Sequence, residues 1–191
     1  MAFFPMFMNM DDLKVLVVGG GAIAHEKLEK LVDFTKEITV ITSALSTEAH
    51  QLIGDHCLTL YQRAYREGDI EGFDVVIVAT DTQALHKAIY EESRSSRILV
   101  NSVDNTAYCD FIFPSYVKKE DLTIAFSTGG TSPAFAKHIR RHFERIIPDS
   151  VGAFLKKMKR LRTEIPKGKE RMEKFDKMAE QFIEKEFYKS E

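Results

Sequence analysis

The stretch Val15-Leu-Val-Val-Gly-Gly-Gly-Ala-Ile-Ala24 decides the fold of this chain. Four apolar β-forming residues lead directly into Gly19-x-Gly21-x-x-Ala24, and an amphipathic helical pattern follows. A strand, a tight glycine turn and a helix start, in that order, are typical of a dinucleotide-binding unit. Gly19 permits the turn, Gly21 lets the backbone approach a pyrophosphate, and Ala24 lets the helix lie close to the strand. The alternative is a glycine turn in an α/β domain that binds no nucleotide.

The expected acid at the adenosine ribose is missing. Dinucleotide-binding units usually carry an Asp or Glu about 20 residues beyond the glycines, where it binds the ribose 2′-hydroxyl. The apolar strand Glu37–Ser43 ends instead in Thr42 and Ser43, followed by Ala44, and no arginine for a 2′-phosphate lies there. The pattern therefore predicts NAD as the cofactor and leaves NADP open.

Strands and helices alternate over the first 110 residues, which predicts an α/β fold with a Rossmann-like parallel sheet. Strands are expected at 15–18, 38–41, 59–61, 74–81 and 97–103, and helices at 22–33, 46–53 and 83–93. Ligands of such sheets bind beyond the carboxyl ends of the strands. We therefore expect one crevice to be lined by Gly19–Gly21, Thr42–Ser43, Thr80–Asp81 and Asn101–Asp104.

The pattern changes after residue 104. Apolar segments at 111–117 and 122–126 flank a charged turn and indicate a hairpin, and a helix is expected at 134–147. Helical patterns at 151–164 and 169–188 form a tail. We therefore expect a cofactor domain at 1–110, a small α+β region for dimerisation and substrate at 111–147, and a helical domain at 148–191. The apolar N-terminus is expected to form a short strand packed on the first domain.

Composition narrows the class of protein. The chain has 191 residues, a net charge of −2 and two cysteines, which fits a reduced cytoplasmic protein. No apolar run is long enough to span a membrane. Residues 151–191 carry twelve Lys and Arg against eight Asp and Glu. Because the two signs are interleaved, a solvated helix face is favoured over a nucleic-acid contact.

A few side chains could carry chemistry. Asp104 follows a strand that should end at the crevice, so it is a candidate general base, with a simple turn residue as the alternative. Asp81 could contact the cofactor, but capping of the following helix is favoured. His138 and His142 have a metal-binding spacing, yet they lie on a basic helix face, so no metal site is predicted.

Five motifs in order resemble those of precorrin-2 dehydrogenases, the siroheme-synthase enzymes. They are Val-Val-Gly-Gly-Gly-x-Ile-Ala (17–24), Val-Ala-Thr-Asp (78–81), Val-Asn-Ser-Val-Asp (100–104), Cys-x-Phe-Ile-Phe-Pro (109–114) and Ser-Thr-Gly-Gly-Thr-Ser-Pro (127–133). The resemblance covers about residues 5–147. The chain length leaves no room for a fused methyltransferase domain, so the freestanding form is expected. The sequence departs from the family pattern at Glu26-Lys27, at Thr82 and His86, and at Thr128.

The resemblance implies oxidation of precorrin-2 to sirohydrochlorin with NAD⁺, with Fe²⁺ inserted by some members. It places the essential aspartate on Asp104 and implies a homodimer built partly through the helical tail. The alternative is an NAD- or tetrapyrrole-binding regulatory module without turnover. The expected cofactor contacts are Gly19, Gly20, Gly21, Ala22, Ile23, Ser43, Ala44, Thr80, Asp81 and Asn101. The expected substrate contacts are Ser127, Thr128, Gly129, Gly130, Thr131, Ser132, Lys137 and Arg140.

Overall fold

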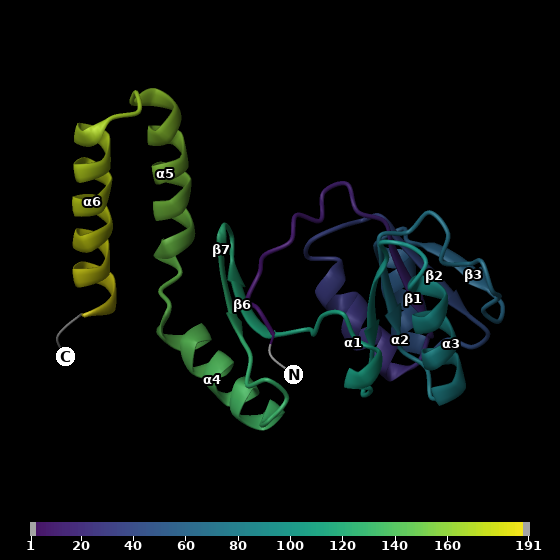
Figure 1. Cartoon of the computed structure of the whole chain (residues 1–191). Coiled ribbons are helices and arrows are strands. Elements are labelled where there is room, and N and C mark those ends of the chain that lie inside the picture. The colour runs from purple at the N-terminus through teal and green to yellow at the C-terminus, as the bar shows by residue number, and fades with distance from the viewer. Residues whose placement is uncertain (1–2, 189–191) are drawn as a thin grey trace. The chain divides into compact units, whose positions relative to one another are not determined.

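The computed structural model describes residues 3–188 (Figure 1). The chain divides into two compact units, the first being Phe3–Ile112 and the second beginning at Phe113. This boundary lies two residues from the expected end of the cofactor domain. The hairpin, the helix after it and the two C-terminal helices all belong to the second unit.

The first unit is built on a five-stranded parallel sheet, which confirms the predicted fold class. Its strands are β1 (Val15–Val18), β2 (Ile38–Thr42), β3 (Thr59–Gln62), β4 (Val75–Val78) and β5 (Leu99–Ser102). They lie in the order β3-β2-β1-β4-β5, and every neighbouring pair is parallel. All residues of β1 and β4 are buried, as expected for strands covered on both faces. The strand order reverses between β1 and β4, the point at which ligands bind in such sheets.

Three helices connect the strands: α1 (Ala22–Leu31), α2 (Thr47–Asp55) and α3 (Gln83–Ser93). Ala24 and Leu28 of α1 are fully buried, because the apolar stripe of this helix faces the sheet. The Ser46 hydroxyl caps α2 by accepting a hydrogen bond of 3.1 Å from the Ala49 N–H. A short 3-10 turn, η1 (Thr106–Tyr108), follows β5. The core therefore fixes the carboxyl ends of the strands, where the glycine turn lies.

Two local predictions were wrong. Residues 3–12 form no strand, and Phe4, Met6 and Phe7 are exposed. A strand needs a backbone partner, and β1 already has β2 and β4 on its two sides. Asp81 does not cap α3 either. Thr82 occupies the N-cap position, and no side chain caps that helix.

The second unit starts with the antiparallel hairpin β6 (Ser115–Lys119) and β7 (Leu122–Phe126), whose turn includes Glu120 at a φ of 55°. Helices α4 (Pro133–Ile146), α5 (Ser150–Glu164) and α6 (Lys169–Phe187) follow, and α5 and α6 run antiparallel (Figure 1). The rings of Phe154 and Phe182 stack at 4.2 Å between centroids. The apolar stripes of the tail thus pack partly against each other. Across residues 3–188, no helix has the length and apolar character needed to cross a membrane.

Candidate dinucleotide site

The glycine turn between β1 and α1 has almost no space for side chains. Gly19 has a φ of 125°, and a Cβ built there would lie 2.1 Å from the Ala79 carbonyl oxygen. A Cβ on Gly20 would lie 2.4 Å from the Ala44 carbonyl oxygen. Gly21 differs, because a Cβ there would meet nothing within 4 Å. The first two glycines therefore let the ends of β2 and β4 close on the turn, and Gly21 faces open space.

Gly21 is also the N-cap residue of α1, and the first turn of this helix contains no acidic residue. The first N–H groups of a helix have no partner within it and carry a partial positive charge. A pyrophosphate is the kind of group that such a helix start binds, and here the backbone is open to it. The role predicted for Gly21 fits this geometry.

A cavity of about 720 Å³ opens over the glycine turn. Nine of the ten predicted cofactor residues line it, namely Gly19, Gly20, Gly21, Ala22, Ile23, Ser43, Ala44, Thr80 and Asp81. Its volume falls within the range of ligand-binding clefts. Residues that the sequence had not marked as contacts also line it, among them Leu45, Ser46, Ala64, Tyr65, Thr82 and Leu85. Leu45, Ser46 and Thr82 follow predicted contacts directly in the sequence, whereas the fold brings Ala64 and Tyr65 from beyond β3 and Leu85 from α3.

Asn101, the tenth predicted contact, lies elsewhere. Its side chain is buried, and its Nδ2 donates a hydrogen bond of 2.8 Å to the Phe111 carbonyl oxygen. Its amide thus ties β5 to the end of the first unit and does not line the cavity. An Asn near a strand end gave no signal from sequence that its amide would serve the backbone.

The part of the cavity that follows β2 is lined by hydroxyl-bearing and apolar residues and by no charged side chain. The Thr42 hydroxyl donates to the Ala44 carbonyl oxygen at 2.7 Å, and the Ser46 N–H donates to the Gly20 carbonyl oxygen at 2.8 Å. These bonds hold the segment after β2 against the glycine turn, with Ser43 exposed. Asp81 is the single charged residue among the lining residues, so the lining includes no cation for a 2′-phosphate.

Asp104 lies just beyond β5 in an unusual backbone conformation. Its φ is 62°, in the left-handed region that residues other than glycine seldom adopt, and its side chain is exposed. Lys27 of α1 approaches it. Burial lowers the pKa of Lys27, while the negative charges of Glu26 and Asp104 oppose that shift. Lys27, which the sequence had shown only as a departure from the family pattern, therefore brings a partly buried cation near Asp104.

The loop that carries Asp104 is closed at its base by two hydrogen-bonded links. The Ser102 N–H donates to the Cys109 sulfur at 3.2 Å, and the thiol donates back to the Ser102 carbonyl oxygen at 3.1 Å. The carboxylate of Asp110 accepts from the Val100 N–H at 2.9 Å and from Arg94 at 2.6 and 2.9 Å. Burial alone would raise the pKa of Asp110, but these hydrogen bonds lower it overall. Both links join β5 to residues 109–110, so they close the loop at its base.

The predicted substrate loop belongs to the second unit and is held by its own hydroxyls. Ser132 caps α4 by accepting from the Phe135 N–H at 3.2 Å, and the Thr128 hydroxyl accepts from the Ser132 N–H at 3.0 Å. Gly129 and Gly130 have positive φ angles of 60° and 85°. Ser127 and Thr131 complete the turn. The contacts predicted for this loop stay predictions.

The basic face of α4 is solvated. Lys137, His138 and His142 are exposed, and Arg140 pairs with Glu144 at 2.7 Å. Over residues 3–188 no group of three or more His, Cys, Asp and Glu side chains could hold a metal ion. The histidine pair therefore has no third ligand within the described part of the chain.

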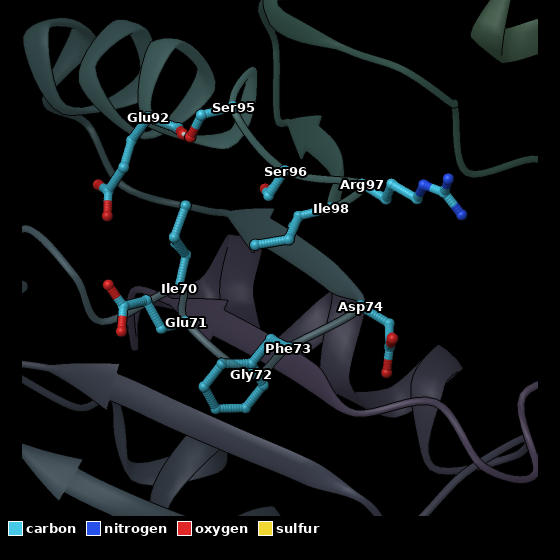
Figure 2. Close-up of a pocket in the computed structure, with 10 residues that line it drawn as sticks. All are labelled: Ile70, Glu71, Gly72, Phe73, Asp74, Glu92, Ser95, Ser96, Arg97 and Ile98. Atoms are coloured by element: carbon cyan, nitrogen blue, oxygen red, sulfur yellow. Dashed lines mark hydrogen bonds between the residues drawn. The ribbon is translucent and has the colours of Figure 1, made fainter.

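A second cavity, of about 380 Å³, lies at the opposite edge of the sheet, where β4 and β5 begin (Figure 2). The carboxylates of Glu71 and Glu92 lie at the end away from Arg97 (Figure 2). Glu92 accepts hydrogen bonds from the Tyr65 hydroxyl at 2.6 Å and from the Gly68 N–H at 2.7 Å. Asp74 accepts from the Lys14 N–H at 2.9 Å. These polar groups hold the fold together, and we assign no ligand to this cavity.

Comparison with known proteins places the cofactor site in a family. A family model described as "Putative NAD(P)-binding" matches residues 6–115, which include the glycine turn, the cavity and Asp104. The chain belongs to this NAD(P)-binding family. A second model, described as the central part of sirohaem biosynthesis proteins, matches residues 119–146. The cofactor of the first unit is therefore a nicotinamide dinucleotide.

Curated relatives agree with the motifs. The chain is 36% identical over 151 residues to a siroheme synthase of Pseudoalteromonas atlantica, covering 79% of this chain and 33% of the relative. It is 34% identical over 165 residues to that of Pseudomonas fluorescens, covering 86% and 36%. The chain thus spans about a third of the length of these relatives. The resemblance to siroheme-synthase enzymes is confirmed.

A solved structure has the same fold over nearly the whole chain. It is SirC, described as a precorrin-2 dehydrogenase, and it matches with a TM-score of 0.80 over 98% of this chain and 93% of that protein. The sequence identity is 23%, so the likeness shows the fold.

Proposed function

We propose that this chain is an NAD-dependent dehydrogenase that oxidises precorrin-2 to sirohydrochlorin, with Asp104 as the general base. The observation that carries the proposal is the open cavity over the glycine turn. Asp104 lies outside its lining but just beyond the end of β5, the strand next to β4, whose continuation at Thr80 and Asp81 lines the cavity. The siroheme-synthase relatives and the fold of a precorrin-2 dehydrogenase support the choice of substrate. The reaction removes one hydride and one proton, so its products are sirohydrochlorin, NADH and H⁺.

Each part of the cavity has a role in this proposal. The backbone N–H groups of Gly21, Ala22 and Ile23 bind the pyrophosphate at the start of α1. Ser43 and Ala44 contact the adenosine ribose, and the absence of a cation from the lining favours NAD over NADP. When bound, the nicotinamide supplies the redox chemistry by accepting the hydride. Asp104, exposed and set by its loop, takes the proton.

The second unit would recognise the carboxylates of the tetrapyrrole. Backbone N–H groups of the turn from Ser127 to Ser132 and the exposed ammonium of Lys137 suit anionic groups. Arg140 already has an anionic partner in Glu144 and would have to exchange it for a substrate carboxylate.

Anaerobic incubation with precorrin-2 and NAD⁺ tests the proposal. We expect NADH and sirohydrochlorin to appear together in equal amounts by absorbance. Replacement of Asp104 by Asn should lower turnover at least about a hundredfold, the usual contribution of a general base. Asp55→Asn, an exposed carboxylate at the end of α2, is the matched control and should leave turnover unchanged. Absence of NADH with the unmodified protein would overturn the proposal.

Three finer features complete it. Fe²⁺ added to the same reaction is a proposed second substrate, and siroheme formed faster than without protein would support chelation.

Met172 and Ile183 of α6 are 69% and 40% exposed, and we propose that this face joins two copies in a homodimer. Sedimentation of the Met172→Glu, Ile183→Glu variant should show a monomer, while the unmodified chain should sediment as a dimer. Both cysteines are free thiols, which fits a cytoplasmic location.

A further inference from the structure

His86 is a buried titratable side chain that the proposed mechanism does not use. It lies in the first turn of α3 and is 0% exposed. Its Nε2 lies 2.8 Å from the Thr80 carbonyl oxygen, and its Nδ1 makes a short hydrogen bond with the Ser102 hydroxyl. Because a carbonyl oxygen only accepts, the network assigns the ring proton to Nε2. In the neutral ring, Nδ1 then accepts from the Ser102 hydroxyl.

These two bonds join the end of β5 to the segment that follows β4. The last ladder bond between β4 and β5 runs from the Val103 N–H to the Val78 carbonyl oxygen at 3.0 Å. Beyond it the two chains diverge. One continues through Thr80, which lines the dinucleotide cavity, and the other continues to Asp104. His86 bridges Ser102, the last residue of β5, to Thr80, which lies two residues beyond the end of β4.

The wall at Thr80 also supports the glycine turn. The carbonyl oxygen of Ala79, one residue before Thr80, is the heavy atom closest to a Cβ built on Gly19, at 2.1 Å. A shift of the Ala79–Thr80 segment would therefore change the space available over that turn. The hydrogen bond from His86 restrains this shift, because the Thr80 carbonyl has a fixed, water-excluded donor.

We propose that His86 is a positioning residue that holds two strand ends at a fixed separation: the cavity wall at Thr80 and the β5 end that leads to Asp104. Its bond to Thr80 serves NAD binding, and its bond to Ser102 serves the placement of Asp104. The first half rests on NAD(P) binding alone. The second half rests on the proposed function.

Two substitutions separate the two bonds. In His86→Gln the amide reaches the place of Nε2, so it can still donate to the Thr80 carbonyl. In His86→Asn the amide reaches only the place of Nδ1, so it keeps the Ser102 partner and loses Thr80. We expect the dissociation constant of NAD⁺, measured by titration calorimetry, to rise about threefold to tenfold in His86→Asn and to stay within about twofold in His86→Gln.

The effects on kcat should show the opposite order of the two His86 variants. His86→Gln and Ser102→Ala should lower kcat for precorrin-2 oxidation with little change in the KM for NAD⁺, and His86→Asn should mainly raise that KM. Thr35→Val is the control, because Thr35 is another buried polar residue of the first unit and its hydroxyl accepts from the Glu37 N–H at 3.1 Å, away from the cavity lining and from the Asp104 loop. A merely structural role for His86 would lower the thermal midpoint in all of these variants and leave kcat and the NAD⁺ constants alone.

Equal NAD⁺ affinity in His86→Asn and the unmodified protein, at a temperature where circular dichroism shows both folded, would overturn the first half of the proposal. Unchanged kcat in Ser102→Ala would overturn the second half, and this variant decides it even if the His86 variants fail to fold. The calorimetric titration contains no precorrin-2. If the unmodified protein binds NAD⁺ but does not oxidise precorrin-2, the proposed function fails and the role of His86 in NAD⁺ binding is still decided.

Discussion

Alanine at each of two neighbouring glycines should separate cofactor binding from folding. A Cβ at Gly21 meets nothing within 4 Å, and its φ of −81° suits any residue. Gly21→Ala should therefore change the free energy of unfolding by no more than about 1 kcal/mol. The new methyl group would occupy the space through which a phosphate approaches the start of α1. Loss of one charge-assisted hydrogen bond, about 1.5–3 kcal/mol, raises the dissociation constant of NAD⁺ about tenfold to a hundredfold.

Gly20→Ala should do the opposite. Its Cβ would lie 2.4 Å from the Ala44 carbonyl oxygen and 2.8 Å from the Thr42 methyl carbon, so the backbone after β2 must move. Overpacking of this kind costs about 1–3 kcal/mol, or a fall of roughly 2–12 °C in the thermal midpoint. Calorimetric titration with NAD⁺ and thermal unfolding by circular dichroism measure the two effects. Unchanged NAD⁺ affinity in Gly21→Ala would refute the placement of the phosphate, and unchanged stability in Gly20→Ala would refute the close contact.

Three further substitutions test the electrostatics and the packing. Because the pKa of Asp110 is lowered in the folded state, its pairing with Arg94 stabilises the protein above the ordinary pKa of about 3.9. Asp110→Asn should therefore lose about 1–2 kcal/mol at neutral pH in urea unfolding, and the difference should vanish in acid. Because burial lowers the pKa of Lys27, the unmodified protein should gain stability relative to Lys27→Met as the pH rises from neutral toward about 10.4. Phe182→Ala removes the stack on Phe154 and should cost about 1–3 kcal/mol in the same urea assay.

The sheet and its helices could be predicted from the sequence because their signals are local. The buried runs of β1 and β4 and the alternation with amphipathic helices fix the element types, and Gly19 marks the turn. The expected strand 74–81 was longer than β4, since the last bond to β1 is donated by the Ala79 N–H and the chain then leaves the sheet to form part of the cavity wall. Pattern alone does not show where a buried strand stops pairing.

Contacts across the sheet could not be predicted in the same way. Three contacts join residues that are separated in the chain. Gly20 lies close to Ala44, the Asn101 amide donates to the Phe111 carbonyl oxygen, and Lys27 is partly buried near Asp104. A sequence shows that a polar group is present but not which partner satisfies it once the helices close on the sheet. The N-terminal segment illustrates the same limit, because its apolar residues gave a strand signal and yet residues 3–12 pair with no strand.

The Cys109 thiol, which closes the base of the Asp104 loop, makes this closure resistant to oxidation. Burial raises the pKa of Cys109, so the sulfur stays protonated, and the protonated form is the poor nucleophile and the slow target of oxidants. A loop closed by a disulfide would open and close with the redox potential of its surroundings. Here the closure is made by the Cys109 thiol, which is hydrogen-bonded to both the N–H and the carbonyl oxygen of Ser102. The loop that carries Asp104 is therefore held by a contact that changes in the surrounding redox potential do not break.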